Sequence, residues 1–121
     1  MVGYLRPALH MPEIYLYRQP VDFRKQSHGL AAIVEGELGH NPFSGGLYVF
    51  TNRGYNRIKM LMWEGNGFVL YYKALAEERF IWPKGEEALM FLTGQQINFL
   101  LDGMDIMALR GHRTLDYESV F

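Results

Sequence analysis

Two runs of mainly apolar and aromatic residues flank a glycine-containing turn within residues 57–73. The turn, Glu-Gly-Asn-Gly at 64–67, is typical of the connection in a β-hairpin. Because successive side chains of a strand point to opposite faces, the first strand is predicted to have one mixed and one apolar face. The mixed face would carry Arg57, Lys59, Leu61 and Trp63, and the apolar face Ile58, Met60 and Met62.

Shorter runs of β-branched and aromatic residues predict further strands. They lie at residues 14–17, 47–50 and 79–82, and a short apolar run follows at residues 88–92. Pro20 and Pro83 follow the first and the third of these runs, where proline ends a strand because it has no N–H to donate. The chain is therefore expected to form a sheet of several short strands.

Helical spacing of apolar residues predicts a long helix over residues 23–38. Asp22 precedes it as a candidate N-cap, and Gly39 follows as a candidate C-terminal stop. Arg24 and Lys25 would then lie in the first turn, where positive charge opposes the helix dipole. Two interpretations stay open: an anion site built from free amide groups and these two side chains, or a solvated helix end.

A second, shorter helix is predicted over residues 95–101. Thr93 and Gln96 fit a capping box at its start, and Gly103 is a natural stop. The expected fold class is therefore α+β, with a mostly antiparallel sheet of about five or six strands and one longer and one shorter helix packed on it.

The 121 residues are most simply one domain. We expect a flexible N-terminal tail at 1–13, a single α+β domain at 14–105 and a C-terminal tail at 106–121. Met1 and Met11 are both candidate starts of the natural chain. No apolar run approaches the roughly 18–20 residues that cross a bilayer, so no contact with a membrane is expected.

Charge and cysteine content narrow the classes of function. Twelve Lys and Arg against thirteen Asp and Glu give a formal charge of −1. A dedicated nucleic-acid binder usually has a basic excess, so any such contact must come from a local patch. The chain has no cysteine, which excludes disulfides, cysteine-type zinc sites and a thiol nucleophile and fits a reducing cytoplasm.

The hairpin and the segments near it supply a local patch of basic and aromatic side chains. Cationic groups can bind phosphates, and aromatic rings can stack on bases. The candidate nucleic-acid-binding residues are Arg24, Lys25, Arg53, Tyr55, Arg57, Lys59 and Lys73. The alternative is a solvated sheet face on which Arg and Lys stems cover aromatic rings.

Large aromatic side chains are also enriched at the hot spots of protein–protein interfaces. The candidate partner-binding residues are Trp63, Tyr71, Tyr72 and Trp82. The alternative is that these rings pack within the sheet and its core.

Residues arranged for catalysis are scarce. Asp102 with Asp105, or Asp116 with Glu118, offer carboxylates for Mg²⁺, but solvated carboxylates are usual at a helix stop and in a polar tail. No phosphate loop, nucleophile elbow or paired-histidine pattern is present. We therefore expect no catalytic residue, no metal site and no cofactor. The four histidines, far apart in the sequence, are His10, His28, His40 and His112.

Short blocks of sequence follow one another in a characteristic order. They are Pro-Val-Asp-Phe-Arg-Lys at 20–25, Gly-Leu-Ala-Ala at 29–32, Asn-Pro-Phe-Ser at 41–44, Tyr-Val-Phe at 48–50, Asn-Arg at 52–53, Arg-Ile-Lys at 57–59, Trp-Glu-Gly-Asn-Gly-Phe at 63–68, Tyr-Lys at 72–73, Arg-Phe at 79–80 and Trp-Pro at 82–83. In these blocks the chain resembles the small accessory protein (TnpB, from the second reading frame) of the insertion sequence 66 family of bacterial transposable elements. The resemblance covers roughly residues 14–105.

This resemblance implies a role in DNA transposition beside a separate transposase that carries the catalytic acidic residues. Two hypotheses follow. In the first, the protein is a non-catalytic accessory protein that binds element-end DNA weakly, or together with the transposase, through the basic–aromatic hairpin. In the second, it docks on the transposase without touching nucleic acid. Family members are more basic after Asn52 and Lys73 than this chain, which has Gly54, Ala74 and Glu77 there, and this difference favours weak binding.

Overall fold

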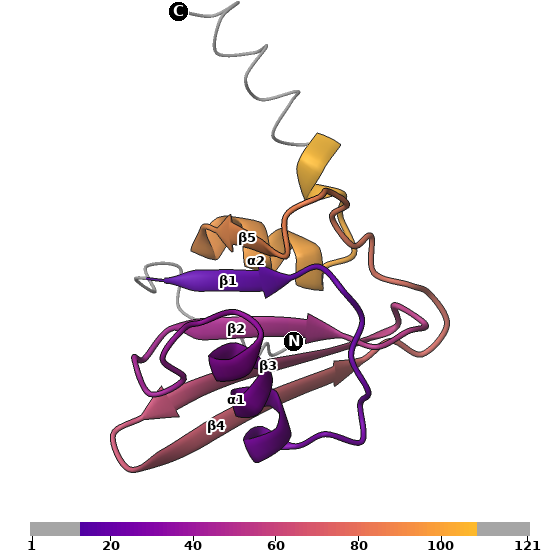
Figure 1. Cartoon of the computed structure of the whole chain (residues 1–121). Helices are drawn as coiled ribbons and strands as arrows, with labels where there is room; N and C mark the ends of the chain where they lie inside the picture. The colour runs from indigo at the N-terminus through magenta and orange to yellow at the C-terminus, as the bar shows by residue number, and fades with distance from the viewer. Residues whose placement is uncertain (1–12, 109–121) are drawn as a thin grey trace, which may run out of the picture.

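The structure, a computed structural model, describes residues 13–108, so most of both predicted tails lies outside the described residues. Figure 1 shows helices and a single twisted sheet. The elements are β1 (Ile14–Tyr17), α1 (Ser27–Gly36), β2 (Leu47–Thr51), β3 (Arg57–Glu64), β4 (Gly67–Ala74), β5 (Leu89–Leu92) and α2 (Gly94–Leu101). Helical backbone is found again at 106–108. The predicted α+β class, with one longer and one shorter helix, is confirmed.

The five strands form one sheet in the order β4-β3-β2-β1-β5. β1 and β2 are parallel, and the other neighbouring pairs are antiparallel. Helix α1 supplies the crossover that a parallel pair requires. The mostly antiparallel sheet agrees with the prediction. The parallel pair also brings the carboxyl ends of β1 and β2 to the same edge of the sheet, as their arrowheads in Figure 1 show.

Each face of the sheet has its own apolar core, and the two cores confirm the alternation predicted for β3. Ile58 of β3 packs in a core with Leu100 of α2, which we call the α2-side core. Leu61 of β3 packs with Leu30 and Val34 of α1 in the α1-side core. The two helices therefore cover opposite faces of one sheet.

The hairpin and α2 form where local signals predict them. Gly65 has a φ of 59°, which suits the tight turn between β3 and β4. Thr93 accepts a hydrogen bond from the Gln96 backbone N–H at 3.1 Å, and the Gln96 side chain accepts one from the Thr93 N–H at 2.9 Å. Gly103, with a φ of 86°, follows the Asp102 C-cap of α2 and has the left-handed backbone expected of a helix stop. Helix α1 instead ends at Gly36, ahead of the predicted stop at Gly39, whose φ is 67°.

Helix α1 begins later than predicted. It starts at Ser27, and its N-cap is Gln26, which makes no capping hydrogen bond through its side chain. Asp22 instead accepts a hydrogen bond from the Arg24 backbone N–H at 2.9 Å, which stabilises a turn ahead of the helix. The prediction that Arg24 and Lys25 lie in the first helical turn is therefore wrong.

Residues 79–82 do not form the predicted strand. The Phe80 backbone N–H donates to the Tyr55 carbonyl oxygen at 2.7 Å, and the Trp82 indole N–H donates to the Arg18 carbonyl oxygen at 3.1 Å. Phe80 and Trp82 are both buried in the α2-side core. The segment is thus held by two buried rings and by loop carbonyls instead of by a ladder of strand hydrogen bonds.

Candidate functional site

Lys59, on the predicted phosphate-contacting face of the hairpin, is buried. Its ammonium group donates hydrogen bonds of 2.8 Å to the carbonyl oxygens of Phe23 and Lys25. The same nitrogen lies 5.0 Å from the centre of the Phe23 ring and 5.6 Å from that of Tyr72. Burial lowers the pKa of Lys59. The Lys59 ammonium therefore makes its hydrogen bonds within the protein, where they link β3 to the segment before α1.

Lys73 and Tyr55 also make contacts within the protein. The Lys73 ammonium donates to the Leu101 carbonyl oxygen at 2.9 Å, at the last residue of α2, where the helix dipole favours a cation. Tyr55 has a φ of 57° and packs against the α2-side core. Both residues therefore help to fix loops and helices in place.

The other four candidate cations, Arg24, Lys25, Arg53 and Arg57, are exposed. Arg24 forms a bidentate ion pair with Asp22, in which Nη2 lies 2.6 Å from Oδ2. These hydrogen bonds from Arg24 lower the pKa of the Asp22 carboxyl group. Part of the positive charge at this position is thus neutralised by an acid on the same loop.

The loop that carries Arg53 is shaped by one asparagine. The Asn52 side-chain oxygen accepts hydrogen bonds of 3.1 Å from the backbone N–H groups of Asn56 and Arg57. Its side-chain nitrogen donates to the Asn56 side-chain oxygen at 2.7 Å. Because these bonds close the loop on itself, Arg53 and Arg57 project from an ordered turn.

Two segments far apart in the sequence meet at the carboxyl ends of β1 and β2. The Val21 backbone N–H donates to the Thr51 carbonyl oxygen at 2.9 Å. Residues 20–23 and 52–54 together line a cleft of about 390 Å³. Arg53 lies on one wall of this cleft, and Arg24 comes directly after Phe23, which lines the other wall. We call Arg24, Lys25, Arg53 and Arg57 the basic loop surface.

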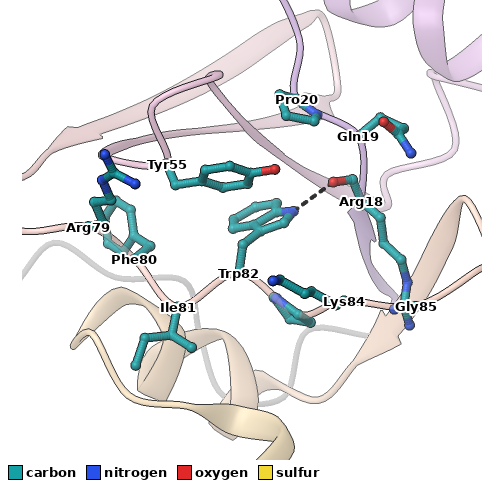
Figure 2. Close-up of a pocket in the computed structure, with 11 residues that line it drawn as sticks. Arg18, Gln19, Pro20, Tyr55, Arg79, Phe80, Ile81, Trp82, Lys84 and Gly85 are labelled. Carbon is teal, nitrogen blue, oxygen red and sulfur yellow. Dashed lines mark hydrogen bonds between the residues drawn. The ribbon is translucent and has the colours of Figure 1, made fainter.

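A second cavity, of about 500 Å³, adjoins this cleft at Pro20. Figure 2 shows the rings of Tyr55 and Trp82 inside it, with Arg79 on one side and Arg18 on the other. Lys84 also lines it. We call this cavity the Arg18 pocket.

Sequence reasoning missed the Arg18 pocket, because its cations come from segments that are distant in the sequence. Arg18 follows directly after β1, whereas Arg79 and Lys84 belong to the segment mistaken for a strand and its continuation. A prediction of the parallel β1–β2 pair would have pointed here, since crevices in such sheets open at the carboxyl ends of parallel strands.

The candidate partner-binding aromatics do not form a single patch. Trp63 packs edge-on against Phe43 and Phe68, with ring centres 4.9 and 5.0 Å apart. Phe43 is 54% exposed. This aromatic cluster, Phe43, Trp63 and Phe68, borders a groove of about 680 Å³ that His28 and Glu35 of α1 also line.

The other three aromatics lie elsewhere. Tyr72 is 52% exposed on the α1 side, where it contacts Phe23 edge-on. Tyr71 is partly buried against the α2-side core, and Trp82 is buried within that core. Of the four candidates, Trp63 and Tyr72 are therefore available to a partner without rearrangement of the core.

Within residues 13–108, no three or more His, Asp or Glu side chains come together as a possible metal site. Asp105 accepts hydrogen bonds from the backbone N–H groups of Met107 and Ala108, at 3.0 and 3.1 Å, at the start of a helical segment. Asp116 and Glu118 lie outside the described residues. In the same part of the chain, no helix combines the length and apolar character needed to cross a bilayer.

A small α+β domain with a basic loop surface beside a basic pocket is the class of protein that these features define. Comparison with known families then gives a specific match: residues 12–111 match the family described as IS66 Orf2 like protein. The chain belongs to this family, whose members are accessory proteins associated with transposition of IS66 elements. The family resemblance deduced from the sequence blocks is therefore confirmed.

Two relatives from Sinorhizobium fredii (strain NBRC 101917 / NGR234) align with most of this chain. The uncharacterized protein y4hO is 34% identical over 99 residues, which cover 82% of this chain and 86% of y4hO. The uncharacterized protein y4jC is 32% identical over 92 residues, which cover 76% of this chain and 79% of y4jC. No solved structure gives a significant match.

Proposed function

We propose that the protein is a non-catalytic accessory protein that contacts the DNA backbone at the ends of its element, together with the transposase of that element. The basic loop surface carries this proposal. It joins Arg24 and Arg53, from segments on either side of α1 and β2, at one edge of the sheet. Exposed guanidinium groups bind phosphate through two parallel hydrogen bonds, without regard to base sequence.

The distribution of charge explains why such binding would be weak. The whole chain carries a formal charge of −1, and Asp22 pairs with Arg24 on the surface itself. Each phosphate contact adds to affinity by releasing counterions, so a few cations give a small, salt-sensitive term. A transposase bound to the same DNA would supply the remaining affinity. We place this activity in the bacterial cytoplasm, where the DNA of the element lies.

Fluorescence anisotropy with a duplex of the element's terminal repeat, at low and physiological salt, tests the proposal. We expect salt-sensitive binding that the transposase strengthens. The double variant Arg53→Gln/Arg57→Gln should lower the slope of log affinity against log salt by about two units, one for each lost phosphate contact. The charge-conserving Arg53→Lys/Arg57→Lys is the matched control. Equal binding by all three proteins would contradict the proposal.

A second candidate function, docking on the transposase without DNA contact, is favoured by the aromatic cluster. Phe43 exposes 54% of its surface beside a groove, and exposed aromatics of this kind are common at interface hot spots. If this function is correct, Phe43→Ala should weaken binding to the purified transposase in the absence of DNA, while Arg53→Gln/Arg57→Gln leaves it unchanged. The opposite pattern would favour the basic loop surface.

A further inference from the structure

The Arg18 pocket concentrates positive charge in a chain that is nearly neutral overall. Its lining includes Arg18, Arg79 and Lys84, and none of its described lining residues is acidic. Its volume of about 500 Å³ lies within the range of small-ligand sites, roughly 300–1,000 Å³. Three cations around one cavity repel one another, so the arrangement favours an anionic occupant.

Arg18 gives the second and independent observation. Its Nε and Nη1 atoms are buried, and neither has a hydrogen-bond partner among the described residues. Buried donors are nearly always paired, and an unpaired one calls for a missing water or ion. The Arg18 guanidinium therefore has hydrogen-bonding capacity that the protein itself does not use.

Gly85 lets the guanidinium group take this position. A Cβ atom on Gly85 would overlap the Nη1 atom of Arg18, so a side chain at position 85 would push the guanidinium aside. The Trp82 indole N–H holds the Arg18 carbonyl oxygen at 3.1 Å, which fixes the backbone from which the side chain starts (Figure 2). The segment 82–85 thus positions Arg18 through both its backbone and its side chain.

We propose that the Arg18 pocket binds a phosphate group through Arg18 and Lys84, with Arg79 adding positive charge at the opposite side. Arginine matches the geometry of phosphate with two hydrogen bonds, and lysine adds a point charge. The source of the phosphate depends on the proposed function: a DNA phosphodiester if the basic loop surface contacts DNA, or a free phosphate compound if it does not.

The two tryptophans of the chain provide a direct assay. Trp82 lines the pocket, whereas Trp63 belongs to the aromatic cluster. In ¹⁵N–¹H spectra of the full-length protein, inorganic phosphate should shift the Trp82 indole signal and leave that of Trp63 in place, compared with chloride at equal ionic strength. A Trp82 signal that does not respond to phosphate would overturn the proposal.

Three variants test the residues of the pocket. Lys84→Gln removes an exposed charge. Gly85→Ala displaces the Arg18 guanidinium without changing any charge, and Arg18→Gln removes the guanidinium altogether. Each should lower the affinity for phosphate, measured from the Trp82 shift, by about tenfold, which is the typical effect of losing one hydrogen bond to a charged group. Lys84→Gln and Gly85→Ala keep the test valid if Arg18→Gln does not fold. An unchanged response in both would overturn the proposal.

A parallel titration with terminal-repeat duplex identifies the source of the phosphate. If the pocket holds a DNA phosphate, Lys84→Gln should reduce the salt slope of DNA binding by about one unit. If duplex fails to bind while inorganic phosphate still shifts Trp82, the DNA-binding function fails and the pocket is a site for a free phosphate compound. If duplex binds and phosphate does not shift Trp82, the pocket proposal alone fails.

Discussion

The ammonium group of Lys59 donates a 2.8 Å hydrogen bond to the carbonyl oxygen of Lys25, a residue 34 positions earlier in the chain. The bond joins the first half of β3 to the segment that precedes α1. It places Arg24 and Lys25 close to the sheet edge although no helix begins there. A cation that the sequence pattern assigns to phosphate binding thus fixes the position of other cations that remain exposed.

Lys59→Met should lower the free energy of unfolding by about 2 kcal/mol, since it leaves the Phe23 and Lys25 carbonyl oxygens without their donor. The hydrophobic replacement recovers part of the loss, because a buried ammonium is itself costly. Urea denaturation measures the effect. Lys25→Met, at an exposed position, is the comparison and should change stability by less than about 0.5 kcal/mol. Equal stability of the two variants would show that the Lys59 hydrogen bonds are dispensable.

The parts of the fold that sequence reasoning predicted correctly are those with strong local signals. The Gly65 turn and the Thr93 capping box determine their elements within a few residues, so β3, β4 and α2 form as predicted. The prediction of where α1 starts was wrong, because the Asp22 carboxylate accepts hydrogen bonds from Arg24 instead of capping the helix. Which donors Asp22 accepts from depends on the contacts of its segment with the hairpin, and the local sequence does not reveal these contacts.

The candidate site was only partly predictable for the same reason. Exposed Arg53 and Arg57 project from a loop that its own asparagines close, so a local signal exists. Burial of Lys59 depends on a segment more than thirty residues away. The Arg18 pocket needs three segments to meet, and the parallel pairing that brings them together has no local signature.

Thr93→Ala should destabilise the protein by about 1 kcal/mol, because the backbone N–H of Gln96 loses its acceptor at the start of α2. Thermal or urea denaturation would detect this loss. Thr93→Ser, which keeps the hydroxyl group, should retain most of the stability. A loss of equal size in both variants would indicate that the threonine methyl group, and not the cap, stabilises the helix.

The raised pKa of Tyr17 predicts that the protein loses stability at alkaline pH. Burial, followed by a 2.7 Å hydrogen bond to Glu37, raises the pKa of Tyr17 to about 12 from its ordinary value near 10. The folded state therefore holds the phenolic proton more tightly than the unfolded state. This contribution is fully present below pH 10 and is lost as the pH rises toward 12.

Urea denaturation of the wild-type protein and Tyr17→Phe between pH 9 and 12 isolates this effect. Other shifted groups, such as Tyr48 with its raised pKa and Lys59 with its lowered one, titrate in both proteins and cancel in the difference. The stability difference between the two proteins should shrink as the pH rises. A difference that is constant over this range would contradict the role of the Tyr17 proton.

Asp22→Asn should strengthen binding to terminal-repeat duplex. The substitution removes the carboxylate that pairs with Arg24, whose side chain is 91% exposed and available to a phosphate once released. Asparagine keeps the side-chain oxygen that accepts from the Arg24 backbone N–H, so the turn is preserved. The affinity should rise a few-fold at low salt, because the substitution removes a negative charge that would repel a bound phosphate.

Glu35→Gln is the matched control for this change, because it alters the net charge equally from a position on α1 that borders the aromatic groove. Anisotropy titrations at several salt concentrations should give Asp22→Asn a salt slope steeper by about one unit, and leave that of Glu35→Gln unchanged. If both variants bind more tightly by the same factor, the gain reflects net charge alone. Arg24 would then not contact phosphate, and the basic loop surface would be reduced to Lys25, Arg53 and Arg57.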